Sequence, residues 1–350
     1  MKRGVAILLS IMLLSGCSAL PAEDRAFAVA LGISENAGLW EVGVRVPVYQ
    51  TGGGYMTLSA KGSSLGEAMA LLNASAPMEL HYGQLRLMVF SESTARRASF
   101  PELLRALAAR GEVRPQAALA VTRDNVLDVM DALEPATGSR LSKSLETLLE
   151  AREKTGVAAI VTLDEWQRMG ERQQAVLLNV AMEPGQSGAL QGMNATAGEL
   201  PVQGAGKAQF SGGWMMNAEG KVQETLSAAE MQLLALLKDE LHQGTLTLPE
   251  GTLTLLDTDS KLTLEQDSIR CKLRVQYSAA SMTEEGVQDA LISALQGLTG
   301  KLSAAGCDAL GIARKAVLGC STAEEWRQMT RPERYAAMAW HFVIQVEREA

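Results

Sequence analysis

The order of apolar and polar residues along this chain predicts interspersed strands and helices. In residues 40–49 the side chains alternate between apolar and polar, and Pro47 lies on the polar face, which predicts a half-buried strand at a sheet edge. Residues 85–89 repeat the alternation. In residues 283–304 apolar side chains recur three or four positions apart, which predicts a long amphipathic helix with one buried face: Val287, Leu291, Leu295, Leu298 and Leu302.

Shorter apolar runs and capping residues complete the predicted elements. Further strands are expected at 27–33, 117–121, 175–181, 207–210, 214–216, 244–248, 252–256, 261–265, 269–277 and 340–346. Further helices are expected at 64–73, 100–110, 125–133, 139–154, 227–237 and 323–329. This order predicts an α+β fold with mixed sheets and packed helices, in two main units or three subdomains, with largely antiparallel sheet in the C-terminal half.

Residues 183–206 differ from the rest of the chain. They include six glycines and two prolines and have little apolar periodicity, which is typical of a long loop or an interdomain linker. We therefore expect an N-terminal α/β domain at 17–182 and a C-terminal α+β domain at 207–350.

The first 16 residues have the form of a lipoprotein signal peptide. Lys2 and Arg3 precede an apolar run, residues 5–14, that is too short to span a bilayer but suits a secretory signal. Leu14-Ser15-Gly16-Cys17 then matches a lipobox, so Cys17 is the predicted lipid attachment site and first mature residue. The alternative is an ordinary signal peptide with a chance cysteine. Two or more acyl chains on Cys17 would give a stable membrane anchor.

Composition and charge indicate which kinds of molecule the chain is suited to bind. The 350-residue chain is 47% hydrophobic and 21% charged, which is typical of a globular protein. Its formal net charge is −8, and removal of Lys2 and Arg3 with the signal makes it −10. An acidic chain without clusters of basic and aromatic residues is not suited to bind nucleic acid.

Candidate catalytic chemistry is sparse. The three histidines, His81, His242 and His341, are far apart in the sequence, and no nucleophile, phosphate-binding or metalloprotease motif is present. Asp257 and Asp259 lack the other ligands of a calcium loop and are expected in a turn. We therefore predict no catalytic residues, no cofactor-binding residues and no metal ligands.

Two structural roles are possible for the remaining cysteines, and two for three of the tryptophans. Cys271, Cys307 and Cys320 are an odd number without a Cys-x-x-Cys pair, which favours isolated buried thiols over a disulfide between Cys307 and Cys320. Core packing is expected for the tryptophans, with surface anchors as the alternative: Trp40, Trp214 and Trp340.

Several short motifs, taken in order, carry a family resemblance. In the N-terminal half, the lipobox is followed by an acidic stretch leading into Leu-Gly-Ile at 23–33, a helix and strand at 64–92, and an arginine-rich helix at 100–114. The C-terminal half contains Gly-Lys-Ala-Gln-Phe and Leu-Ser-Ala-Ala-Glu within 206–230, and Cys-Asp-Ala-Leu-Gly at 307–311. In this order the chain resembles the Ger(x)C lipoproteins, the C subunits of GerA-type nutrient germinant receptors of endospore-forming bacteria. It departs from that pattern at Ser18, where the family usually has Trp, and at its end, which lacks the usual Gly.

The resemblance implies a non-enzymatic subunit on the outer face of the spore inner membrane, assembled with membrane A and B subunits. Two alternatives remain. A solute-binding lipoprotein of a membrane transporter would need the repeated βα units of a two-lobed protein, and a cell-wall enzyme would need a catalytic constellation.

Overall fold

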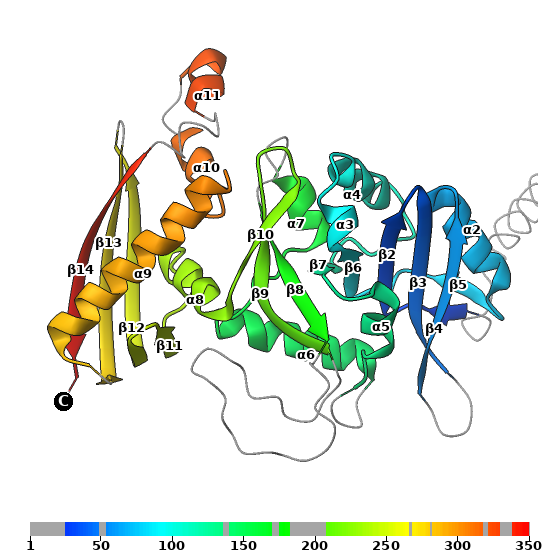
Figure 1. Ribbon diagram of the computed structural model, residues 1–350, viewed down its shortest axis with the longest axis horizontal. Coiled ribbons are helices and arrows are strands. Elements are labelled where there is room, and N and C mark those ends of the chain that lie inside the picture. The colour runs from blue at the N-terminus through cyan, green and yellow to red at the C-terminus, as the bar shows by residue number, and fades with distance from the viewer. Residues whose placement is uncertain are drawn as a thin grey trace, which may run out of the picture.

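The computed structural model describes residues 25–48, 54–135, 140–169, 175–182, 208–265, 268–280, 282–317, 321–329 and 338–349. These residues form three sheets of two, eight and four strands. Figure 1 shows an elongated molecule, in which the four-stranded sheet lies at one end and the eight-stranded sheet extends through the remainder. The predicted α+β fold with mixed sheets is confirmed.

Four parallel strands form the middle of the eight-stranded sheet, and an antiparallel hairpin extends it on each side. The strand order is β10-β9-β8-β7-β6-β2-β3-β4. The parallel strands are β2 (Ala30–Asn36), β6 (Leu87–Ser91), β7 (Ala118–Thr122) and β8 (Val176–Met182). The hairpin strands are β3 (Leu39–Pro47), β4 (Tyr55–Gly62), β9 (Ala208–Met216) and β10 (Val222–Leu226).

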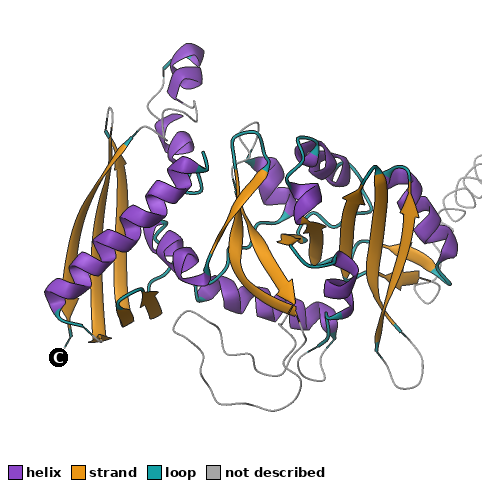
Figure 2. Ribbon diagram, in the orientation of Figure 1, coloured by secondary structure: helices purple, strands orange, loops and turns teal. Residues whose placement is uncertain are grey.

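Helices cover both faces of this sheet (Figure 2), which explains why its central strands are almost continuously apolar. One core contains side chains from α2 (Leu65–Ser75), α3 (Glu92–Ala95), α4 (Phe100–Ala108) and α7 (Leu163–Arg168). The core on the other face contains side chains from α5 (Val126–Asp131) and α6 (Leu141–Lys154). Beside them, β1 (Arg25–Phe27) and β5 (Glu79–His81) form the two-stranded parallel sheet.

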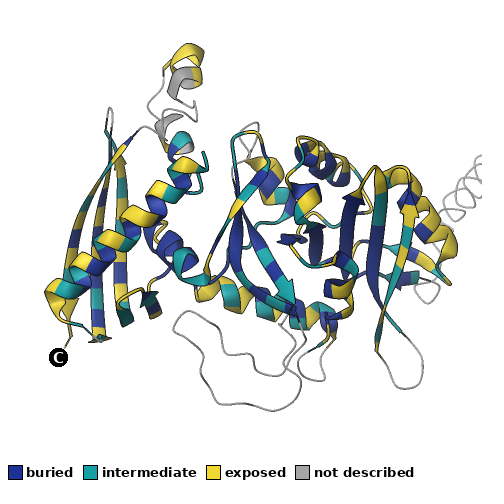
Figure 3. Ribbon diagram, in the orientation of Figure 1, coloured by how far each residue is buried: buried dark blue, intermediate teal, exposed yellow. Residues whose placement is uncertain are grey.

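The four-stranded sheet has the order β11-β12-β13-β14, with β14 parallel to β13 and the other pairs antiparallel. Its strands are β11 (Gly244–Leu248), β12 (Gly251–Leu264), β13 (Ser268–Ala280) and β14 (Ala339–Arg348). The helices of this part are α8 (Ala228–Leu237), α9 (Glu284–Ala304), α10 (Ile312–Val317) and α11 (Ala323–Met329). One face of the sheet packs on α8 and α9, and the opposite face is exposed (Figure 3).

The predicted helix starts agree with the observed caps. Ser64 Oγ accepts a hydrogen bond from the N–H of Glu67, and Asn125 Oδ1 accepts from the N–H groups of Leu127 and Asp128. These side chains satisfy amide groups that have no partner within the first helical turn.

The sheets bear on two predictions. Residues 183–206 lie outside the described residues, and the predicted division there stays a prediction. However, β9, which we assigned with β10 to the C-terminal unit, pairs with β8, which precedes the linker, and β10 pairs with β9. A change of composition marks a loop, and a long loop can also join two neighbouring strands of one sheet.

The second difference concerns the predicted turn at Asp257 and Asp259. Both residues lie within β12, which is one strand of 14 residues where we expected two. The pairing register with β13 shifts near Leu255, and this bulge interrupts the alternation of apolar residues without ending the strand.

Candidate functional site

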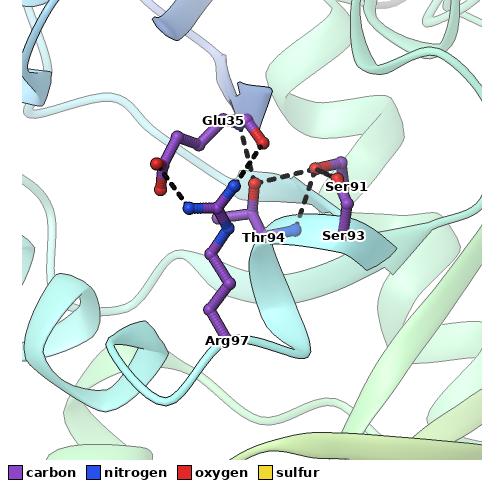
Figure 4. A network of polar contacts seen from close by, with 5 residues as sticks. All are labelled: Glu35, Ser91, Ser93, Thr94 and Arg97. Carbon is purple, nitrogen blue, oxygen red and sulfur yellow. Dashed lines mark hydrogen bonds and ion pairs between the residues drawn. The ribbon is translucent and has the colours of Figure 1, made fainter. Parts of the chain in front are cut away.

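A polar network lies where β2 and β6 end, on the carboxyl side of the parallel strands (Figure 4). It consists of Glu35, Ser91, Ser93, Thr94 and Arg97. Strand β6 ends at Ser91, whose hydroxyl accepts a hydrogen bond from the N–H of Thr94 and so caps α3. Thr94 is buried, and its hydroxyl oxygen accepts a bond of 2.8 Å from the N–H of Glu35. The cap of one helix is therefore joined to the end of the neighbouring strand.

The ion pair between Glu35 and Arg97 completes this network. Arg97 Nη1 lies 2.5 Å from Glu35 Oε1, and Arg97 Nη2 donates to the Glu35 carbonyl oxygen at 3.4 Å. The Glu35 side chain is only 10% exposed and that of Arg97 is 38% exposed. A carboxylate buried this far needs a charged partner, and the partially exposed guanidinium supplies it.

Two further arginines lie over an aromatic ring near this network. The guanidinium carbons of Arg123 and Arg96 lie 4.9 and 5.8 Å from the centre of the Trp214 ring. Glu92 forms ion pairs with both, at 2.7 Å to Arg96 and 3.5 Å to Arg123. Trp214 is buried, and its Nε1 donates to Asn179 Oδ1 at 2.9 Å. Cation–π contacts of this kind stabilise the packing of an arginine side chain on the ring.

This edge of the sheet has the chemistry of a structural support, because its arginines are paired with Glu35 and Glu92. The Ser91 and Ser93 hydroxyls lie 3.0 Å apart, and the network contains no histidine or lysine that could activate either of them. The strand order reverses between β2 and β6, but β2 leads into the antiparallel strands β3 and β4, unlike the parallel strands that flank a ligand-binding switch point in a doubly wound α/β sheet. Within the described ranges, no group of three or more His, Cys, Asp or Glu side chains is placed to hold a metal ion.

The three histidines lie far apart in the structure. His81 packs on Phe27 at the end of β5, His242 Nδ1 lies 3.1 Å from the Thr258 carbonyl oxygen, and His341 is exposed on β14. Each therefore lies in a different part of the fold.

The two described thiols are isolated, as predicted. Cys271 and Cys307 are free and buried. Burial raises the pKa of Cys271 to about 11 and that of Cys307 to about 12, so both remain protonated at neutral pH. Cys320, the other half of the alternative disulfide, lies outside the described residues.

The tryptophans also belong to the core. Trp214 is fully buried, and Trp40 packs on the core of the eight-stranded sheet. Trp340 stacks on Phe342 at 5.8 Å between ring centres and packs on the core of the four-stranded sheet. The prediction of core packing is confirmed.

Residues 19–180 match the family model described as the spore germination protein N-terminal domain. This part of the chain is therefore similar to the N-terminal domain of spore germination proteins. The resemblance to the Ger(x)C family is thereby confirmed. Among curated proteins, no sequence matches this chain. A solved structure described as the crystal structure of the GerBC protein is similar over 91% of this chain and 96% of its own, with a TM-score of 0.51 and 14% sequence identity. At this identity the likeness shows a shared fold.

The structure explains two motifs that carried the likeness to Ger(x)C proteins beyond the matched domain. In Leu-Ser-Ala-Ala-Glu, Ser227 and Glu230 form a reciprocal capping box at the start of α8. Glu230 also binds Lys301 of α9, with its two oxygens 2.9 and 3.1 Å from Nζ. The Glu230 side chain therefore both caps α8 and forms an ion pair with α9.

The Asp-x-x-Gly corner of the Ger(x)C pattern is a helix start. Asp308 accepts hydrogen bonds of 2.7 Å from the N–H groups of Ile312 and Ala313 at the beginning of α10. Gly311 has a φ of +65°, a conformation that glycine adopts without steric cost. Both motifs therefore fix local structure and have no catalytic arrangement.

Cys17, the site residue predicted from the lipobox, lies outside the described residues and stays a prediction. The polar network was missed because Glu35 and Arg97 are 62 positions apart in the sequence. The one available signal was a charged residue, Glu35, at the end of an apolar strand.

Proposed function

We propose that this chain is the lipid-anchored C-type subunit of a germinant receptor and that it acts by binding membrane A and B subunits. The match of residues 19–180 to the germination family carries this proposal. The isolated histidines and the protonated thiols support a binding role over turnover of a substrate.

The fold also supports a tether at the N-terminal end. Cys17 precedes the first residue of β1 by eight positions, so extended chain would keep β1 within about 30 Å of an acylated Cys17. In the described part of the chain, no helix has the length and apolar character needed to cross a membrane. Figure 1 shows the four-stranded sheet at the far end of the long axis from β1–β5. A lipid on Cys17 would therefore hold one end of the molecule at the membrane and leave the other end free to reach a partner.

Purification from spore membranes tests this proposal. A C-terminally tagged chain is expected to recover membrane subunits of the A and B types, and mass spectrometry is expected to find acylated Cys17 at its N-terminus. The Cys17→Ala variant is the matched control and should be released from the membrane or remain unprocessed.

Recovery of neither subunit, together with tight binding of a transported solute by the purified chain, would contradict the receptor role. That result would favour a solute-binding lipoprotein.

A further inference from the structure

Two arginines lie on neighbouring segments at the amino ends of the central parallel strands, where α6 packs on the sheet. Arg86 directly precedes β6, and Arg114 lies four positions before β7. The backbone joins these segments, because the N–H of Ala118 donates to the Arg86 carbonyl oxygen at 2.9 Å and the N–H of Arg114 donates to the Tyr82 carbonyl oxygen at 3.3 Å. This edge of the sheet is opposite to the one that carries the polar network of Figure 4.

One carboxylate on α6 serves this group of cations. Arg86 Nη1 lies 3.3 Å from Glu146 Oε1, and Lys143 Nζ lies 3.2 Å from Glu146 Oε2. Arg114 forms no ion pair with any described residue. Burial, and then the positive charge of Arg86, lower the pKa of Arg114, and the charge of Glu146 acts in the opposite direction. We call Arg86, Arg114, Lys143 and Glu146 the arginine cluster.

The arginine cluster has an excess of positive charge. Its three cations and one carboxylate sum to +2. The next charged residues along α6 are Arg140 on one side and Glu150 on the other, and they leave this sum unchanged. The charged residues just before Arg114, Arg110 and Glu112, pair with each other at 2.7 Å. The whole chain has a net charge of −8, so the excess at the arginine cluster is local.

Both guanidinium groups have lost part of their hydration. Nε of Arg86 and Nε of Arg114 are buried, and neither has a hydrogen-bond partner among the described residues. The side chains of Arg86 and Glu146 are 21% and 32% exposed, so the arginine cluster still opens to solvent. A charge that is partly removed from water interacts more strongly with a counterion than a fully hydrated charge does. The arginine cluster therefore favours a small anion that approaches from the solvent side.

We propose that the arginine cluster binds a phosphate group, which accepts hydrogen bonds from Arg86 and Arg114 and pairs with Lys143. The planar fork of an arginine matches two oxygens of a phosphate, and two arginines and a lysine together supply donors for a tetrahedral anion. The charge of +2 balances that of a phosphate dianion. The phosphate group can come from a soluble phosphate or from a phospholipid head group, because both present the same oxygens. This site goes beyond the proposed function and does not depend on it.

Calorimetric titration of the full-length protein in detergent with inorganic phosphate, at constant ionic strength, tests the proposal. The Arg114→Gln variant is expected to bind phosphate at least about tenfold more weakly than the wild type, because charge-assisted hydrogen bonds are lost. The matched control is Arg110→Gln, which removes a nearby arginine that is already paired with Glu112. This control should bind phosphate as the wild type does.

A second variant separates phosphate binding from a purely structural role. Glu146→Gln removes the one carboxylate of the arginine cluster and raises its charge from +2 to +3. It should bind phosphate about threefold more tightly, although the fold loses the ion pairs of Glu146 with Arg86 and Lys143. If the arginine cluster only supported the fold, Glu146→Gln would lower stability and give no gain in affinity.

A parallel titration with dihexanoyl phosphatidic acid distinguishes the two sources of the phosphate group. Binding of both ligands, with the same dependence on Arg114, would support recognition of the phosphate group itself, and binding of the lipid alone would assign the site to a head group. The inference would be overturned if the wild type bound neither ligand, if Arg114→Gln bound as the wild type does, or if Glu146→Gln bound more weakly. None of these results involves recovery of the A- and B-type subunits, so the proposed function would stand.

Discussion

Replacement of Gly212 by alanine tests whether the chain after residues 183–206 adds β9 and β10 to the eight-stranded sheet. Gly212 lies in β9 at a φ of +76°, where the register with β8 shifts. A Cβ atom there would lie 2.4 Å from the Leu226 carbonyl oxygen of β10. The Gly212 N–H donates to the Val157 carbonyl oxygen at 2.8 Å, so the backbone is held in place. The substitution therefore imposes both an unfavourable φ and a steric overlap.

The magnitude follows from these two terms. The left-handed conformation costs an alanine about 1–2 kcal/mol. Overpacking against a backbone atom costs about 1–3 kcal/mol more, which gives an expected loss of about 2–5 kcal/mol. The matched control is Gly297→Ala on the exposed side of α9, where no atom lies within 4 Å of the new Cβ. That change should increase stability by about 0.5–1 kcal/mol, because alanine is the better helix former.

Urea unfolding followed by tryptophan fluorescence measures both variants, since the buried Trp214 lies two residues from Gly212. The unfolding midpoint is expected to fall for Gly212→Ala and rise for Gly297→Ala. An unchanged or higher midpoint for Gly212→Ala would refute the placement of β9 between β8 and β10.

Three further predictions concern thiols, a helix cap and the loop. In a variant whose other cysteines are changed to serine, Cys271 and Cys307 should not react with a thiol reagent at pH 8 until guanidinium unfolds the chain. The reason is that burial raises their pKa values to about 11 and 12. Rapid labelling of the native protein would contradict their burial. Glu230→Ala should lower the free energy of unfolding by about 1–2 kcal/mol, through loss of the capping box and the Lys301 ion pair, as measured by urea unfolding. The exposed Glu224→Ala should change it by less than about 0.5 kcal/mol, and equal effects of the two would exclude the double role of Glu230. Limited proteolysis should cut first within 183–206, and the two fragments should co-elute in gel filtration because β8 and β9 pair across the cut. Separation of the fragments would contradict that pairing and support a domain boundary at that segment.

Local patterns predicted much of the fold because their causes lie within a few residues. The period of two in 40–49 identified β3, and the Ser-x-x-Glu spacing at Ser227 identified the start of α8. Both depend on contacts between near neighbours in the sequence. The long apolar stripe at 283–304 likewise identified α9, since helix periodicity is a local property.

Features that depend on distant contacts could not be predicted in this way. The pairing of β9 with β8 joins strands separated by a long segment of low periodicity. The glycines at 212 and 213 are a signal for a bulge, but they do not identify the partner strand. The parallel pairing of β14 with β13 in a half expected to be largely antiparallel is of the same kind. The polar network depends on the positions of whole elements, since Glu35 and Arg97 meet only when β2 and α3 pack together.

Germination of spores that lack this chain tests the central claim most directly. Deletion is expected to impair the response to nutrients and to leave the response to a non-nutrient trigger intact, and a plasmid copy with Cys17 intact should restore the nutrient response. Normal germination of the deletion strain on every nutrient tested would contradict the proposed role as a germinant receptor subunit.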